Sequence, residues 1–73
     1  MAVQELPEIL LDARAVAQWL RLSVPTVYEQ ASRGVIPHIR LWRGNRRTVI
    51  RFRREDIQQI LRERRVPSVE SEL

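Results

Sequence analysis

The sequence of 73 residues predicts a small, mainly α-helical domain with one β-hairpin, in the order helix, helix, hairpin, helix. Three observations indicate this order. Two segments with helical spacing are separated by only three residues, an alternating run turns once at a Gly-Asn pair, and a last amphipathic segment begins with acidic residues and ends with basic ones.

The first helix is predicted over residues 13–20. Asp12 stands directly before it and is a good N-cap, because its carboxylate can accept a hydrogen bond from a free backbone N–H of the first turn. Residues 9–11 are apolar and are expected to lie extended against the core. The apolar stripe of this helix, at helical spacing, consists of Ala13, Val16, Ala17 and Leu20.

The second helix follows after a turn of three residues. Ser23 and Val24 are alternative N-caps, because Ser23 has a capping hydroxyl, whereas a residue before Pro25 avoids the α region. Proline at this place suits a first helical turn. The helix is predicted to end near Arg33, with Gly34 as the first residue beyond it.

The hairpin is predicted over residues 38–52, where apolar and polar residues alternate around Gly44-Asn45. Gly-X between two strand-like runs favours a two-residue type II′ turn. Two strands alone are barely stable, so the hairpin is expected to pack on the helices. The cross-strand pairs expected in this register are Ile39–Ile50, Arg40–Val49, Leu41–Thr48 and Trp42–Arg47.

The last helix is predicted within residues 53–65. Glu55 and Asp56 fall in its first turn, where the helix dipole favours acids, and arginines fall in its last turn. Two helices joined by a short turn and followed by a hairpin make a small winged helix-turn-helix, with the hairpin as the wing. Residues 1–8 are expected to be a flexible arm, residues 9–66 the folded domain, and residues 67–73 a disordered acidic tail.

Charge is unevenly distributed along the chain. All 13 basic residues are arginines, and all lie within residues 13–65 together with four acidic residues, which gives this segment a net charge of +9. Both ends of the chain are acidic. A concentration of positive charge favours a polyanionic partner; the alternative interpretation is an ordinary solvated surface.

Composition argues against several other classes. Without cysteine there is no disulfide and no zinc–thiolate site, and one histidine, two glycines and no phosphate-binding loop leave little catalytic machinery. We therefore expect no enzyme activity, no metal and no cofactor. The N-terminus lacks the pattern of a signal peptide, and no apolar run is long enough to cross a membrane, so a cytoplasmic protein is expected.

The ordered motifs resemble the excisionase-like branch of the MerR-type winged helix-turn-helix proteins. The matching pieces lie within residues 10–61 and are Leu20-Arg21-Leu22-Ser23, Thr26-Val27-Tyr28, Arg33-Gly34, Ile36-Pro37, Arg51-Phe52 and Arg54-Glu55-Asp56-Ile57. The resemblance implies sequence-directed binding of double-stranded DNA, with the second helix in the major groove and the wing against the minor groove or the backbone. It further implies a recombination directionality factor that bends DNA and steers an integrase towards excision, or a small transcriptional regulator. Arg21 departs from the family, which usually has glycine there.

The second helix presents a polar stripe opposite its apolar one. Glutamine can pair with adenine, arginine with guanine, glutamate with cytosine, and a threonine methyl with thymine. The alternative is a solvated helix face on which Glu29 and Arg33 pair with each other. Tyr28, which belongs to the core by its spacing, is a further DNA-binding candidate. The base-reading candidates are Thr26, Glu29, Gln30 and Arg33.

The hairpin carries arginines but no acidic residue. Arginines at a wing tip can enter a narrow minor groove or contact phosphates. The alternative is that they protect an edge strand from aggregation. Arg51 has a further alternative, an ion pair with Glu55 or Asp56. The DNA-binding candidates of the wing are Arg40, Arg43, Asn45, Arg46, Arg47 and Arg51.

Two aromatic residues receive separate expectations. Trp42 is expected on the strand face opposite Leu41, where stacking on Arg47, DNA contact and a protein neighbour are open alternatives. His38 is expected to be structural. The leading functional hypothesis is an excisionase whose affinity depends on an integrase partner or on cooperative self-association on DNA. The alternatives are a repressor that binds promoter DNA, and a protein-interaction module whose basic charge is incidental.

Overall fold

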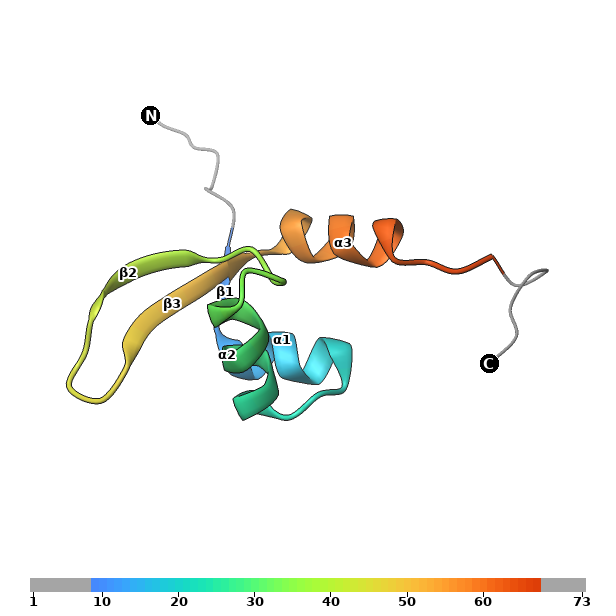
Figure 1. Ribbon diagram of the computed structural model, residues 1–73. Coiled ribbons are helices and arrows are strands. Elements are labelled where there is room, and N and C mark those ends of the chain that lie inside the picture. Colours follow the sequence, from blue (N-terminus) through green and yellow to red (C-terminus); the bar gives the residue numbers. More distant parts are fainter. Residues whose placement is uncertain (1–8, 68–73) are drawn as a thin grey trace, which may run out of the picture.

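The computed structural model of the chain describes residues 9–67 and has three helices and a three-stranded antiparallel sheet (Figure 1). This is the small winged helix-turn-helix that the sequence predicts. The predicted arm, residues 1–8, and all of the predicted tail except Pro67 lie outside the described residues. In chain order the elements are β1 (Leu10–Leu11), α1 (Ala13–Leu20), α2 (Val24–Ser32), β2 (Ile39–Arg43), β3 (Thr48–Arg53) and α3 (Arg54–Glu63).

Helix α1 has the predicted bounds because both of its ends are fixed locally. The Asp12 carboxylate accepts a hydrogen bond from the backbone N–H of Ala15 at 2.9 Å. At the other end Arg21 adopts a left-handed conformation, with φ 60° and ψ 48°. The Leu22 N–H then donates to the carbonyl of Ala17 at 2.9 Å, which is the 6→1 bond of a Schellman motif.

Helix α2 begins at the first of its two alternative N-caps, Ser23, whose hydroxyl accepts a bond from the Thr26 N–H at 3.2 Å. It ends in a second Schellman motif. Gly34 is left-handed, with φ 80°, and Val35 donates to the carbonyl of Gln30 at 2.9 Å. Both helices of the motif therefore end in the same way, one with arginine and one with glycine at the left-handed position.

The sheet has the order β1-β3-β2, so that β3 is the central strand. Leu10 pairs with Arg53, and Leu11 with Phe52, so this segment is extended as predicted. Only Leu11 packs against the core, whereas Ile9 and Leu10 are exposed, contrary to the prediction. Helix α1 packs against β3 and α2 packs against α1, so both helices lie on the same side of the sheet (Figure 1). The buried core consists of Ala13, Val16, Ala17, Val27, Ala31, Ile36, Ile50, Phe52 and Ile57.

The hairpin is present, but its predicted register and turn are wrong. Before the bulge the pairing is one residue away from the predicted register, because Arg40 pairs with Ile50 and not with Val49. A bulge at Leu41 shifts the pairing by a further residue, so that Trp42 pairs with Val49 and not with Arg47. The connection runs over residues 44–47, and Gly44 lacks the positive φ that a type II′ turn requires. Glycine is still needed there, since a Cβ at this position would lie 2.8 Å from the carbonyl oxygen of Arg47.

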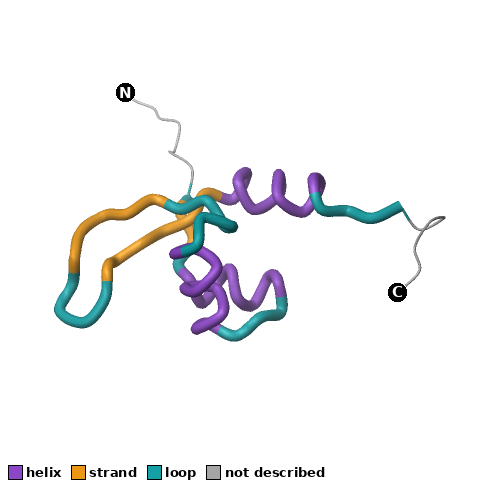
Figure 2. Tube along the Cα trace, in the orientation of Figure 1, coloured by secondary structure: helices purple, strands orange, loops and turns teal. Residues whose placement is uncertain are grey.

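Helix α3 continues from β3 and extends to the same side of the sheet's strands as α1 in the view of Figures 1 and 2, and its fully buried Ile57 belongs to the core. Arg53 precedes it and forms an ion pair with Glu55 at 2.5 Å. The helix ends at Glu63, so of the arginines expected in its last turn only Arg62 lies inside it. Within residues 9–67, no helix is both long and apolar enough to cross a membrane.

Candidate DNA interface

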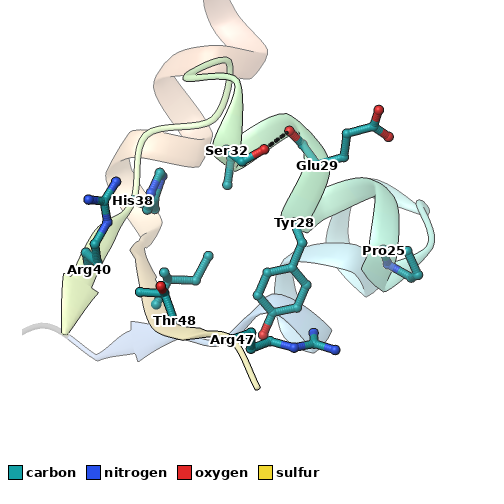
Figure 3. Close-up of a pocket in the computed structure, with 10 residues that line it drawn as sticks. Pro25, Tyr28, Glu29, Ser32, His38, Arg40, Arg47 and Thr48 are labelled. Atoms are coloured by element: carbon teal, nitrogen blue, oxygen red, sulfur yellow. Dashed lines mark hydrogen bonds between the residues drawn. The ribbon is translucent and has the colours of Figure 1, made fainter. Parts of the chain in front are cut away.

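An open groove of about 570 Å³ separates helix α2 from the hairpin (Figure 3). Helix α2 forms one wall with side chains at helical spacing, and the two strands of the hairpin form the other. The walls combine polar and basic groups with apolar surface, to which Ala31 and Ile50 contribute from the core. The polar and aromatic lining residues are Tyr28, Glu29, Ser32, His38, Arg40, Arg47 and Thr48.

One contact crosses the groove. The guanidinium carbon of Arg47 lies 4.5 Å from the centroid of the Tyr28 ring, at a distance typical of a cation–π interaction. Figure 3 shows the ring extending from α2 towards Arg47. The contact joins Arg47, the last residue of the hairpin loop, to Tyr28 in the middle of α2. Because Arg47 lies over Tyr28, Trp42 does not stack on Arg47, which was one of the three alternatives for this tryptophan.

The predicted polar stripe of α2 does not form a single surface. Glu29 and Arg33 are exposed and form the i,i+4 ion pair of the alternative interpretation, with Nη2 and Oε2 3.4 Å apart. Thr26 is half-buried, and its hydroxyl lies 2.8 Å from that of Ser23. Gln30 is half-buried as well. Of the predicted residues of this helix, only Tyr28 and Glu29 line the groove.

The hairpin exposes most of its predicted contacts. Arg40 pairs with buried Ile50 and therefore points towards the groove, while Arg43 pairs with Thr48 on the same face. Asn45 and Arg46 are exposed in the loop. Among the described residues, none of the arginines at 40, 43, 46 and 47 pairs with a carboxylate.

Of the predicted wing residues only Arg40 and Arg47 line the groove, and Arg51 lies farthest from the prediction, on the other face of the hairpin. It pairs with Ile39 on the opposite face of the hairpin, and its Nη1 donates to the carbonyl oxygen of Ile50 at 2.7 Å. Among the described residues it forms no ion pair with Glu55, which pairs with Arg53 instead.

Besides the core residues Ala31 and Ile50, four residues that line the groove were not among the sequence candidates. Pro25 and Ser32 stand three residues before and four residues after Tyr28, so helical spacing alone would have placed them beside it. Thr48 stands two residues before buried Ile50 and so shares its strand face. His38 is structural, as expected: its Nδ1 lies 3.1 Å from the Ile36 carbonyl oxygen, and its ring lies beside Phe52.

Positive charge is concentrated around this groove. Between Glu29 and Glu55 the chain has eight arginines and no acidic residue. Figure 3 shows the Glu29 carboxylate pointing away from the groove, on the side where it pairs with Arg33. Of the eight arginines, Arg40 and Arg47 line the groove, and a surface of this charge favours a negatively charged partner.

A comparison with protein families agrees with this geometry. A family model described as a helix-turn-helix domain matches residues 10–65. The chain belongs to this helix-turn-helix domain family. The family is a DNA-binding one, typically non-enzymatic, and it includes excisionase-like members. No curated protein and no solved structure is found to match the chain. Membership of the family, together with the winged fold, suggests that the protein binds DNA.

Proposed function

We propose that the protein is an excisionase of the MerR-like branch, a recombination directionality factor that binds and bends attachment-site DNA and steers a phage or mobile-element integrase towards excision. The observation that carries the proposal is the arginine-lined groove between α2 and the wing, in a chain of the helix-turn-helix family. Arginines that no carboxylate neutralises, next to a recognition helix, fit a phosphate backbone.

In the docking that we propose, the DNA backbone occupies the groove. Arg40 and Arg47 lie on its hairpin side, and the hydroxyl of Thr48 can donate to a phosphate oxygen, whereas that of Ser32 donates to the carbonyl oxygen of Glu29 at 2.9 Å. With one strand of the backbone held between the two walls, α2 enters the major groove on one side. The tip of the hairpin reaches the adjacent minor groove on the other side, where Arg43, Asn45 and Arg46 are its contacts.

Base reading is assigned to the remaining polar side chains of α2. Arg33 suits guanine and Gln30 suits adenine, because both can form bidentate hydrogen bonds with those bases. Thr26 offers its methyl group to thymine, and its hydroxyl is already held by Ser23. Glu29 accepts from cytosine or orients Arg33 through their ion pair. Tyr28 acts indirectly, by holding Arg47.

One winged domain contacts few base pairs, so we propose that useful affinity requires neighbouring copies on DNA or an integrase. Bending by a wing inserted in the minor groove would bring those sites together. Such a role belongs in the bacterial cytoplasm, at the nucleoid, or in a phage-infected cell. The folded unit in this proposal is residues 9–66.

A recombination assay tests the proposal. An integrase from a neighbouring gene is combined with left and right attachment sites, with and without the protein. Excision that appears only with the protein supports the directionality factor. Tight binding to the protein's own promoter without any effect on excision would instead support the second candidate, a small transcriptional repressor that uses the same DNA surface.

The dependence of binding on salt separates both of these functions from a protein-interaction module. If several arginines contact phosphates, the logarithm of the association constant for a DNA duplex should fall linearly with the logarithm of the salt concentration. The slope should be roughly −0.9 for each phosphate contacted. A shallow slope, or no binding to duplexes that carry the attachment sites, would contradict the DNA-binding proposal.

A further inference from the structure

His38 uses one nitrogen of its ring in the fold and leaves the other without a partner. Its Nδ1 lies 3.1 Å from the carbonyl oxygen of Ile36, and a carbonyl oxygen can only accept a hydrogen bond. Nδ1 must therefore carry the proton of the neutral ring, which leaves Nε2 with a lone pair. Among residues 9–67 no hydrogen bond or ion pair involves Nε2.

The ring lies in the hairpin wall of the groove, beside the core. The antiparallel register places His38 opposite Phe52, and the centroids of the two rings are 6.2 Å apart. Arg40 stands two residues further along β2 and shares the same strand face, and Figure 3 shows both side chains in this wall. Because the Ile36 carbonyl and the Phe52 ring lie against two sides of the imidazole, the end that carries Nε2 remains for the groove.

The charged groups around the ring favour an anion beside it. The Glu29 carboxylate pairs with Arg33 and points away from the groove. Helix α3, which packs on β3, contributes none of its described residues to the lining. In the part of the chain that the structure describes, no carboxylate pairs with His38, so a counter-ion for a protonated ring would be a bound anion. The titratable and charged residues that line the groove with His38 are Tyr28, Glu29, Arg40 and Arg47.

A DNA phosphate in the groove meets the two charge states of this ring differently. A phosphate oxygen carries lone pairs and no proton, so it repels the lone pair of Nε2 in the neutral ring. In the protonated ring Nε2 carries a proton and donates it to the same oxygen. A hydrogen bond between two charged groups is roughly twice as strong as one between neutral groups. A phosphate contact at Nε2 therefore requires that the ring bind a proton.

We propose that His38 is a ligand of the DNA backbone, with Nε2 as a donor to a phosphate next to Arg40, and that the ring takes up one proton when DNA binds. The proposal deepens the proposed function, on which it rests, because it adds a contact to the backbone strand held in the groove. It also makes the affinity for DNA depend on pH. The proton is bound more tightly in the complex than in the free protein, so the gain in affinity is complete at low pH and is lost as the pH rises through the titration of the ring in the complex.

The pH dependence of DNA binding tests the contact. The affinity for one duplex is measured by fluorescence anisotropy at constant salt between about pH 8 and pH 6, the range in which histidine changes its charge. The association constant should rise on the order of tenfold over this range, because uptake of one proton changes it by at most about tenfold per pH unit. The sequence has one histidine, so no second imidazole contributes to the effect.

Two variants with amide side chains separate the roles of the two ring nitrogens. The amide of asparagine reaches the position of Nδ1, so His38→Asn keeps the hydrogen bond to Ile36 but places no donor in the groove. The longer side chain of glutamine brings its N–H group to the position of Nε2, so His38→Gln offers a donor at every pH. Both variants should bind DNA with an affinity that does not change with pH, and at the upper end of the pH range His38→Gln should bind more tightly than His38→Asn. Circular dichroism verifies that each variant is folded, and His38→Gln alone is sufficient for the test if His38→Asn unfolds.

The outcomes separate this proposal from the proposed function. DNA binding that does not change with pH, or that changes equally in His38→Gln, would overturn the contact and leave the proposed function intact. A protein that bound no duplex at any pH would contradict the proposed function and the contact with it. The tautomer is measured without DNA, from the nitrogen chemical shifts of the ring at a pH where it is neutral. These shifts should show the proton on Nδ1, and a proton on Nε2 would overturn the proposal whatever the protein does on DNA.

Discussion

Replacement of Arg21 by glycine should stabilise the domain. Arg21 is the only described non-glycine residue with a positive φ, and a left-handed conformation costs an L-residue with a Cβ roughly 1–2 kcal/mol. Glycine removes this cost but increases the entropy of the unfolded chain, which lowers the free energy of unfolding by roughly 0.4–1 kcal/mol. The net gain expected for Arg21→Gly is therefore about 1 kcal/mol, or roughly 4–8 °C in Tm for a domain of this size.

Two further variants isolate the cause. Arg21→Ala removes the same charge and side chain but keeps the Cβ, so its stability should stay close to that of the unaltered protein. Gly34→Ala makes the reverse change in the second Schellman motif. A Cβ there meets nothing within 4 Å, so its cost is conformational, about 1 kcal/mol after the same correction.

Urea denaturation followed by helical circular dichroism measures all three variants, and the midpoint is compared at a constant m-value. Within the described residues the Arg21 side chain has no hydrogen-bond or ion-pair partner, so no lost contact complicates the comparison. If Arg21→Gly were no more stable than Arg21→Ala, the left-handed conformation would not be the source of strain. The same conclusion would follow if Gly34→Ala cost nothing.

Three further predictions concern the groove and the wing. Tyr28→Leu should weaken DNA binding about two- to fivefold, because the cation–π contact with Arg47 is lost, whereas Tyr28→Phe keeps the ring and should bind normally in a fluorescence-anisotropy titration. Gly44→Ala should distort the loop, since its Cβ would meet the Arg47 carbonyl oxygen at 2.8 Å. DNA affinity should fall while the circular dichroism spectrum stays unchanged. Full DNA affinity would contradict the role of the loop. Arg33→Ala should reduce the difference in binding free energy between DNA sites by about 1–3 kcal/mol. Arg46→Ala should weaken binding to all duplexes equally and lower the salt slope by about 1. Unchanged affinity in both variants would contradict the proposed docking.

The helices could be predicted from the sequence because their signals are local. Asp12, Ser23 and Gly34 fix three of the helix ends through contacts within a few residues, and the structure places all three where the sequence predicts them. Each end depends on hydrogen bonds to the nearest turn of the chain, so distant parts of the fold have little influence on it.

The hairpin could be predicted only in outline because its register depends on distant packing. The Gly44-Asn45 pair is a local signal for a tight turn, but Ile50 and Phe52 must both face the helices, and the bulge at Leu41 lets β2 follow that requirement. A bulge has no dependable sequence signal. The error mattered for function, since the observed register moves Arg40 to the groove face, across from Ile50, and Ile39 to the opposite face, across from Arg51.

The groove itself was only partly predictable. Charge identified the wing arginines, because arginines without acidic neighbours are visible in the sequence. The cation–π contact between Tyr28 and Arg47 was not predictable, because it joins α2 to the hairpin loop, whose separation depends on how α2 packs against α1 and α1 against β3. Residue type alone assigned Tyr28 to both the core and the DNA surface, and its half-buried position at the groove is compatible with both.

The pairing of β1 with β3 affects the order in which the domain can fold. Leu10 and Leu11 meet Arg53 and Phe52 across about 40 residues of chain, so this part of the sheet closes a loop that contains both helices of the motif and the whole wing. On a ribosome the loop stays open until the central strand has left the exit tunnel. Closing it is then the slow, entropically costly event. The backbone amides of β1 and of the middle of β3 should therefore exchange with solvent together, at the rate of global unfolding, whereas those of the wing tip should exchange far earlier.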